Sequence, residues 1–144
     1  MGWSNEQMAA ARALIARHEG LALKPYRDSR GFLTIGRGRC LDTRGISLTE
    51  ADYLFGNDLE GVLTDLAAQA WWEKLDPVRQ VAIADMGFTL GAHGVLAFRR
   101  MIAALLAQKW GAAAEEMRNS QWAKEVGQRA DDDAAIVLTG TLPK

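Results

Sequence analysis

The chain has 144 residues, of which 49% are hydrophobic and 24% are charged. These values are typical of one globular domain that buries a core without metals or disulfides. A single cysteine excludes an intrachain disulfide, and the two histidines have no ligand-spaced neighbours, so neither a metal nor a cofactor is expected. The net charge of −1 argues against a general nucleic-acid binder.

No stretch of about 20 apolar residues predicts a membrane span, so stable membrane insertion is not expected. The apolar run 8–16 is short, follows Glu6 and is interrupted by Arg12, unlike a signal peptide. We expect a monomer that stays in the cytoplasm where it is made.

The first predicted helix begins at a capping box, Ser4 to Gln7, and runs to about His18. Met8, Ala11, Ile15 and His18 share one face, which we expect to be buried. His18 could act as a base, but its place on this apolar face favours a structural role.

The stretch 18–40 carries three chemically useful side chains. Glu19 ends the predicted helix, Asp28 lies in an Asp-Ser-Arg-Gly turn, and Thr34 lies on the strand that follows. Glycines and a proline between them make the chain double back, so the three side chains can meet. Two carboxyl groups facing each other are the groups that hydrolyse a glycosidic bond.

The two carboxyl groups have different predicted surroundings. The negative end of the helix dipole favours the protonated form of Glu19. Arg27 and Arg30 flank Asp28 and favour its ionised form. This contrast is typical of an acid paired with a base.

The segment 23–46 predicts a small antiparallel sheet with a strand over 32–35. Between Lys24 and Arg44, six basic residues stand against two acidic ones. This patch could steer an anionic polymer toward the site, or it could only keep a small hairpin soluble.

The rest of the chain predicts helices. One begins at Ser47 and runs to about Ala68, and another begins at Asp76-Pro77 and runs to about Leu90. Further helices are predicted over about 94–108, 110–118 and 129–138.

Two short motifs in this half of the chain allow more than one interpretation. Trp71 and Trp72 could stack on a sugar, but helical spacing places at least one of them in the core. Asp131 to Asp133 are interpreted as acidic first-turn residues of the last helix.

The Glu-Asp-Thr spacing and the following strand, 33–38, resemble the phage T4-type lysozymes, a family of endolysins similar to glycoside hydrolase family 24 muramidases. The segments 85–98 and 120–130 also resemble that family. The resemblance implies a mainly α (α+β) lysozyme-like domain over 1–144. It implies an N-terminal lobe of about 13–66 with the sheet, a long connecting helix, and a helical C-terminal lobe of about 67–144 with residues 1–12 packed nearby.

The resemblance also implies residue roles. Glu19 would protonate the glycosidic oxygen, Asp28 would stabilise the oxocarbenium-like state or activate water, and Thr34 would position that water. Further residues carried over by position are the substrate-lining Cys40, Phe88 and Thr89, and Arg129, which would reach Glu19.

Arg39 departs from the family, which commonly has histidine at this position. Asp58 is then the expected partner of Arg39, although an exposed and unpaired Asp58 fits the sequence equally well.

The implied function is hydrolysis of the β-1,4 bond between N-acetylmuramic acid and N-acetylglucosamine in peptidoglycan, leading to host lysis. A holin would let the enzyme pass the membrane to the cell wall. The alternatives are a wall-binding module without turnover and a non-hydrolytic transglycosylase, which needs an acid but no second carboxylate. A free endolysin, a tail component and a bacterial effector all fit the sequence.

Overall fold

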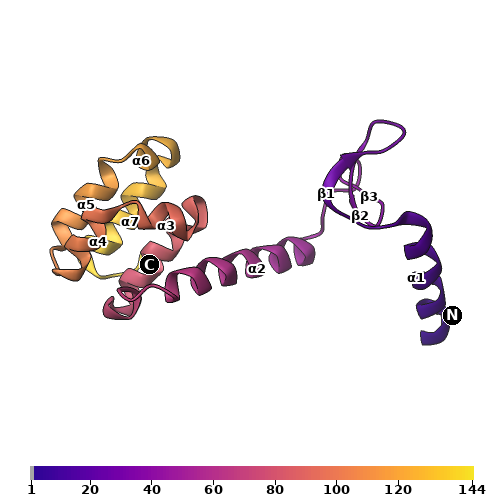
Figure 1. The fold of residues 1–144 in the computed structure, drawn as a ribbon, viewed down its shortest axis with the longest axis horizontal. Coiled ribbons are helices and arrows are strands. Elements are labelled where there is room, and N and C mark those ends of the chain that lie inside the picture. The colour runs from indigo at the N-terminus through magenta and orange to yellow at the C-terminus, as the bar shows by residue number, and fades with distance from the viewer. Residues whose placement is uncertain (1) are drawn as a thin grey trace. The chain divides into compact units, whose positions relative to one another are not determined.

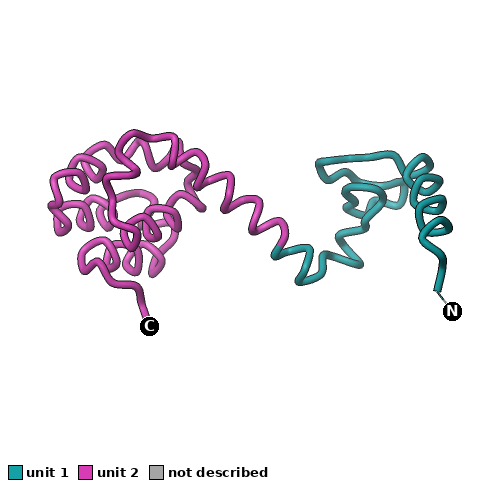
Figure 2. Tube along the Cα trace, turned by 90° about the horizontal axis from the view of Figure 1, so that it is seen from below, with its two compact units in different colours: residues 1–52 teal, residues 53–144 magenta. Residues whose placement is uncertain are grey.

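The computed structural model describes residues 2–144, which form two compact units. The N-terminal unit extends to Asp52, and the helical unit comprises Tyr53–Lys144 (Figure 2). Within residues 2–144, seven α-helices, one short 3-10 helix (Trp72–Lys74) and three strands follow one another, and Figure 1 labels the α-helices and strands. The predicted fold class, mainly α with a small antiparallel sheet, is confirmed.

The first helix, α1 (Asn5–Glu19), begins as predicted. The Ser4 hydroxyl accepts the N–H of Gln7, and the Gln7 side chain accepts the N–H of Ser4. The helix ends at Gly20, whose φ of 68° favours glycine.

The prediction that the apolar face of α1 is buried in a core is wrong for the N-terminal unit. Met8 and Ile15 are 49% and 55% exposed. The physical reason is that this unit offers only three short strands for packing, and Thr34 is its one buried residue among positions 2–52.

The sheet of the N-terminal unit has the strand order β1-β2-β3. Thr34 on the central strand is paired with Tyr26 on one side and Cys40 on the other. Pro25 lies on an edge strand, near an irregularity in the register, where a missing N–H is tolerated. The strands are β1 (Ala22–Arg27), β2 (Leu33–Gly36) and β3 (Arg39–Cys40).

The remaining helices begin largely where the sequence predicts. The side chains of Ser47 and Asp76 each accept the N–H of the residue three positions later. Gly91, with φ of 71°, breaks α3, so the predicted end at Leu90 is a kink inside a longer helix. These helices are α2 (Leu48–Ala67), α3 (Pro77–Leu96), α4 (Arg99–Leu106), α5 (Trp110–Arg118), α6 (Gln121–Val126) and α7 (Gln128–Thr139).

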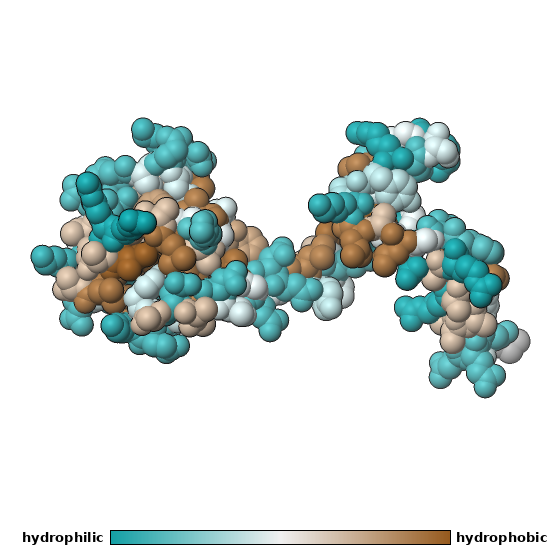
Figure 3. All heavy atoms as spheres, viewed as in Figure 1, coloured by the Kyte–Doolittle hydropathy of each residue, from teal (hydrophilic) through white to brown (hydrophobic). Residues whose placement is uncertain are grey.

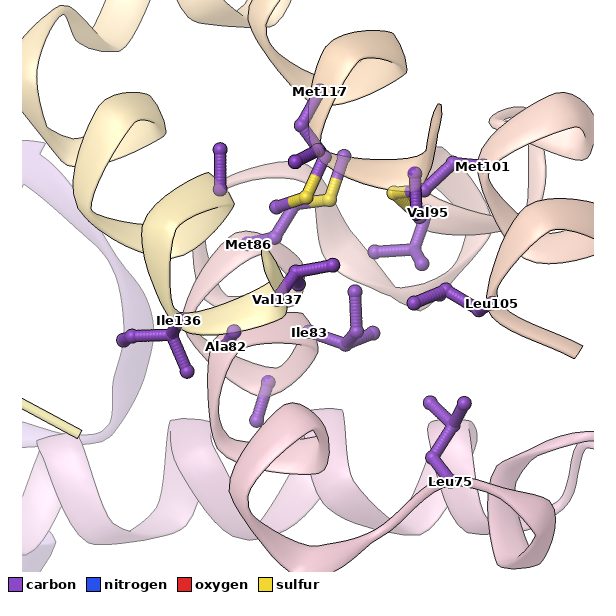
Figure 4. Close-up of a cluster of buried hydrophobic side chains, with 14 of the residues drawn as sticks. Leu75, Ala82, Ile83, Met86, Val95, Met101, Leu105, Met117, Ile136 and Val137 are labelled. Atoms are coloured by element: carbon purple, nitrogen blue, oxygen red, sulfur yellow. The ribbon is translucent and has the colours of Figure 1, made fainter. Parts of the chain in front are cut away.

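The core lies in the helical unit, where α3 packs on α7, and α5 packs on α4 and α7. Figure 4 shows Met86 of α3 and Met117 of α5 pointing toward one another. Trp72 is 6% exposed and belongs to this core, which confirms that one tryptophan of the pair is buried. The ring of Trp71 packs edge-on against the ring of Trp72. The largest fully buried side chains are Leu66, Ile83, Met86, Val95, Met101, Leu105, Met117 and Val137.

Apolar side chains are also exposed along α2. Leu48 and Leu54 are 77% and 51% exposed, and Figure 3 shows hydrophobic surface over the start of this helix. Taken singly, no helix within residues 2–144 is long and apolar enough to cross a membrane. In the same part of the chain, one pair of helices bent by 97°, α3 and α4, is long and apolar enough by length and composition alone.

One arginine joins three helices of the helical unit. Arg79 of α3 donates from Nε to the Val137 carbonyl of α7 at 2.7 Å, and its guanidinium lies 3.7 Å from the Trp110 ring centroid of α5. It also donates to Asp76 at 2.9 Å. Burial would raise the pKa of Asp76, but the hydrogen bonds from Arg79 hold it below its usual value.

Replacing Arg79 by methionine keeps an apolar stem but leaves the Val137 carbonyl and Oδ2 of Asp76 without the donor that the guanidinium supplies. We expect the free energy of unfolding to fall by about 2 kcal/mol in urea titrations. Arg100→Met is the control, because Arg100 is exposed and should change stability by less than about 0.5 kcal/mol. Equal stabilities for the two variants would contradict a joining role for Arg79.

Candidate active site

Glu19 is the last residue of α1, and its carboxyl group lies against the backbone of Gly38. A Cβ atom added at Gly38 would lie 2.6 Å from Oε2 of Glu19. Gly38 also has a φ of 82°, which disfavours other residues. The turn between β2 and β3 therefore forms one wall around the Glu19 carboxyl group.

The carboxylate of Asp28 is held by its own turn. Its Oδ1 accepts the backbone N–H groups of Arg30 and Phe32, each at 2.9 Å. The backbone N–H of Asp28 donates to the Phe32 carbonyl at 2.9 Å and closes the turn. Because Oδ1 is occupied by the backbone, Oδ2 is the oxygen left to act on a ligand or a water molecule.

The two arginines that flank Asp28 in the sequence direct their side chains elsewhere. Arg27 donates to the Gly31 carbonyl at 2.9 Å, and the guanidinium of Arg30 lies 5.1 Å from the centroid of the Phe32 ring. These interactions brace the turn that carries Asp28.

Thr34 is 3% exposed, and its hydroxyl donates to the Phe32 carbonyl at 3.1 Å. The oxygen keeps its lone pairs for accepting a further hydrogen bond. Phe32 therefore binds both predicted residues through its backbone, with its N–H on Asp28 and its carbonyl on Thr34. Cys40, predicted to line the site, is the cross-strand neighbour of Thr34.

Arg39 has a partner that the sequence reasoning missed. Its guanidinium binds the carboxylate of Glu50, and it also donates to the Gly45 carbonyl at 3.3 Å. The backbone N–H of Ser47 donates to the Glu50 carboxylate and lowers its pKa, and the charge and hydrogen bond of Arg39 act in the same direction. Asp58 belongs to the helical unit, so its pair with Arg39 stays a prediction.

The other predicted site residues lie in the helical unit. Arg129 of α7 binds the carboxylate of Asp85 of α3 through two hydrogen bonds, from Nε at 2.9 Å and Nη2 at 2.6 Å, and Nη2 also donates to the Asp85 carbonyl at 3.2 Å. The hydrogen bond with Asp85 raises the pKa of Arg129. Both residues line a largely apolar pocket of about 620 Å³ together with Phe88, whose ring packs 5.4 Å from that of Phe55.

Thr89 has a different neighbourhood from Phe88. Its hydroxyl accepts the indole N–H of the buried Trp122 at 2.8 Å and donates to the Met86 carbonyl at 2.9 Å. These bonds join α3 to α6. A role for Thr89 in lining the substrate, and the contact of Arg129 with Glu19, stay predictions.

The sequence reasoning placed Asp133 in the first turn of the last helix, but it lies beyond the first turn of α7 and is buried. It is 2% exposed, and its Oδ2 has no hydrogen-bond partner within residues 2–144. Burial, followed by the nearby carboxyl group of Asp85, raises the pKa of Asp133 to about 8. The signal in the sequence was its spacing, because Asp133 lies one helical turn after Arg129 and one before the buried Val137.

A mainly α chain that carries two carboxyl groups and a hydroxyl on a small antiparallel sheet and the helix end beside it has the features of a lysozyme-like protein. The chain belongs to the phage lysozyme family, whose model matches residues 16–133.

Individual relatives agree with this assignment. The pre-baseplate central spike protein Gp5 of Enterobacteria phage T4 is 30% identical over 96% of the chain, which spans 29% of that protein. Two proteins of Dictyostelium discoideum, probable T4-type lysozymes 1 and 2, are 26% and 24% identical. Each of these two alignments covers 94% of the chain and 97% of the relative.

The raised pKa of Asp133 predicts a pH-dependent stability. Below its ordinary pKa of 3.8, the carboxyl group is protonated in the folded and the unfolded chain. As pH rises from there to about 8, the unfolded chain loses this proton while the folded chain keeps it, so the free energy of unfolding falls.

Asp133→Asn cannot ionise, and it should flatten this fall in urea titrations across the same pH range. The control is Asp65→Asn, an exposed residue of α2 that should reproduce the wild-type slope. An unchanged slope in Asp133→Asn would show that Asp133 does not keep its proton in the folded chain.

Proposed function

We propose that the chain hydrolyses the β-1,4 bond between N-acetylmuramic acid and N-acetylglucosamine in bacterial peptidoglycan. Membership of the phage lysozyme family supports the coarser assignment, a lysozyme-like muramidase of the glycoside hydrolase class. The observation that carries the finer proposal is the shared anchoring of Asp28 and Thr34 on the backbone of Phe32.

Glu19 is the proposed acid, which donates its proton to the glycosidic oxygen as the bond breaks. Asp28 presents Oδ2 to the developing positive charge or to the attacking water, since Oδ1 is fixed by backbone N–H groups. Thr34 accepts a hydrogen bond from that water. The hydroxyl can do so because its own proton is directed to the Phe32 carbonyl.

The same proposal assigns substrate contacts to Cys40, Phe88, Thr89 and Arg129. Cys40 lies beside Thr34 on the sheet. Phe88 and Arg129 line the pocket of the helical unit, where an aromatic face and a guanidinium suit a sugar and its polar groups.

In the cell, the proposed role is lysis of a bacterial host after a holin opens the membrane. A module within a larger phage assembly is the second candidate, and the 30% identity to part of a spike protein favours it. Expression in a bacterial cytoplasm with and without a holin separates the two roles, because holin-dependent lysis is expected of a free endolysin.

Glu19→Gln keeps the size of the side chain but removes the transferable proton. We expect the release of reducing sugar from purified peptidoglycan to fall by at least about 10²-fold, because general acid catalysis contributes that much. Thermal unfolding, compared with wild type, is the control for an intact fold. Retained turnover in this variant would contradict the assignment of Glu19 as the acid.

Asp28→Asn tests the second carboxylate without disturbing its turn, because the amide oxygen can still accept both backbone N–H groups. A hydrolase should lose activity by a similar factor. The masses of the products are measured as well, since a transglycosylase releases anhydro sugars and a hydrolase releases reducing ends. Full activity with anhydro products would favour the transglycosylase.

A further inference from the structure

The turn between β2 and β3 has a feature that the proposed chemistry does not use directly. Arg37 stands between two glycines in this turn, and its Nη1 donates to the carbonyl oxygens of Ala16 and Gly20, each at 3.1 Å. These two carbonyls flank Glu19 in the sequence. The guanidinium therefore spans the end of the helix that carries the acid.

The carbonyl oxygens of the last helical turn have no donor within their own helix. Gly20 satisfies one lone pair at Ala16 with its N–H at 3.1 Å, and Arg37 supplies the further donor. Among the hydrogen bonds of residues 2–52, those from Arg37 are the ones that join α1 to the strands. Since α1 has no buried residue, these bonds are a principal contact between its end and the β2–β3 turn.

Gly38, the next residue, contacts the acid itself, because its missing side chain leaves the space that Oε2 of Glu19 occupies. Arg37 thus holds the backbone on both sides of Glu19, and Gly38 limits where the carboxyl group can lie. Thr34 begins the same hairpin and Cys40 ends it.

We infer that Arg37 and Gly38 are positioning residues, which set the carboxyl group of Glu19 relative to Thr34 and Asp28. The inference rests on the proposed function, since it names what aligns the proposed acid. Such alignment acts on the chemical step, because a misplacement of about 1 Å can lower the rate by about 10²-fold.

The first test is Arg37→Ala, with soluble peptidoglycan glycan fragments as substrate. We expect kcat to fall about 10- to 100-fold while KM changes little, and Arg37→Lys to recover part of kcat because an ammonium group can still donate to a carbonyl. Arg17→Ala is the matched control. It removes an equal charge from the last turn of the same helix and should keep the wild-type kcat.

The second test compares two glycines of the same turn. Gly36 and Gly38 both have a positive φ, of 69° and 82°, so alanine strains the backbone at either position. Only at Gly38 would the new Cβ meet Glu19, whereas at Gly36 nothing lies within 4 Å. We expect Gly38→Ala to lose kcat and Gly36→Ala to retain most of it.

Three results would overturn the inference: wild-type kcat in Arg37→Ala, an equal loss in Arg17→Ala, or equal losses in the two glycine variants. Glu19→Gln is measured beside them. If that variant stays active, the proposed function fails. If it is inactive while Arg37→Ala has the wild-type kcat, the inference on positioning fails alone.

Discussion

The last turn of an α-helix carries carbonyl oxygens that need donors from elsewhere, and both units meet this requirement with an arginine from a distant segment. Arg37 reaches the end of α1, and Arg79 reaches Val137 in the last turn of α7. The Arg79 guanidinium lies against Gly140, where an added Cβ atom would be 2.9 Å from Nη1, and Arg37 is followed by Gly38, where an added Cβ atom would be 2.6 Å from Oε2 of Glu19. The same arrangement fixes a core helix in one unit and the proposed acid in the other.

The carboxyl groups of Asp28 and Asp133 differ in the hydrogen-bond donors around them. Asp28 receives two backbone N–H groups in a tight turn, whereas Oδ2 of Asp133 receives no donor among the described residues. Arg129 pairs with the carboxylate of Asp85 through two hydrogen bonds. An ionised Asp133 would add a second negative charge beside a cation that is already paired. A neutral Asp133 is therefore the form that fits the helical unit.

The sequence predicts those features whose causes lie within a few residues. The helix starts at Ser4, Ser47 and Asp76 depend on side chains that cap their own first turn, and all three were predicted correctly. The spacing of the proposed catalytic residues is equally local. In contrast, the carbonyls bound by Arg37 lie 17 and 21 residues away, and the burial of Asp133 depends on how α7 packs within the helical unit. Neither the hydrogen bonds of Arg37 nor the burial of Asp133 can be predicted from neighbouring residues, apart from the helical periodicity around Asp133.

Pro25 has a consequence for the behaviour of the chain in concentrated solution. An edge strand with free N–H and C=O groups can pair with a strand of another molecule and start aggregation. β1 is an edge strand and exposes apolar side chains, with Leu23 81% accessible to water. At Pro25 there is no N–H to donate, and the register of β1 is irregular between Ala22 and Tyr26. A second chain therefore cannot extend a regular ladder along this edge, which protects a small sheet that has little core of its own.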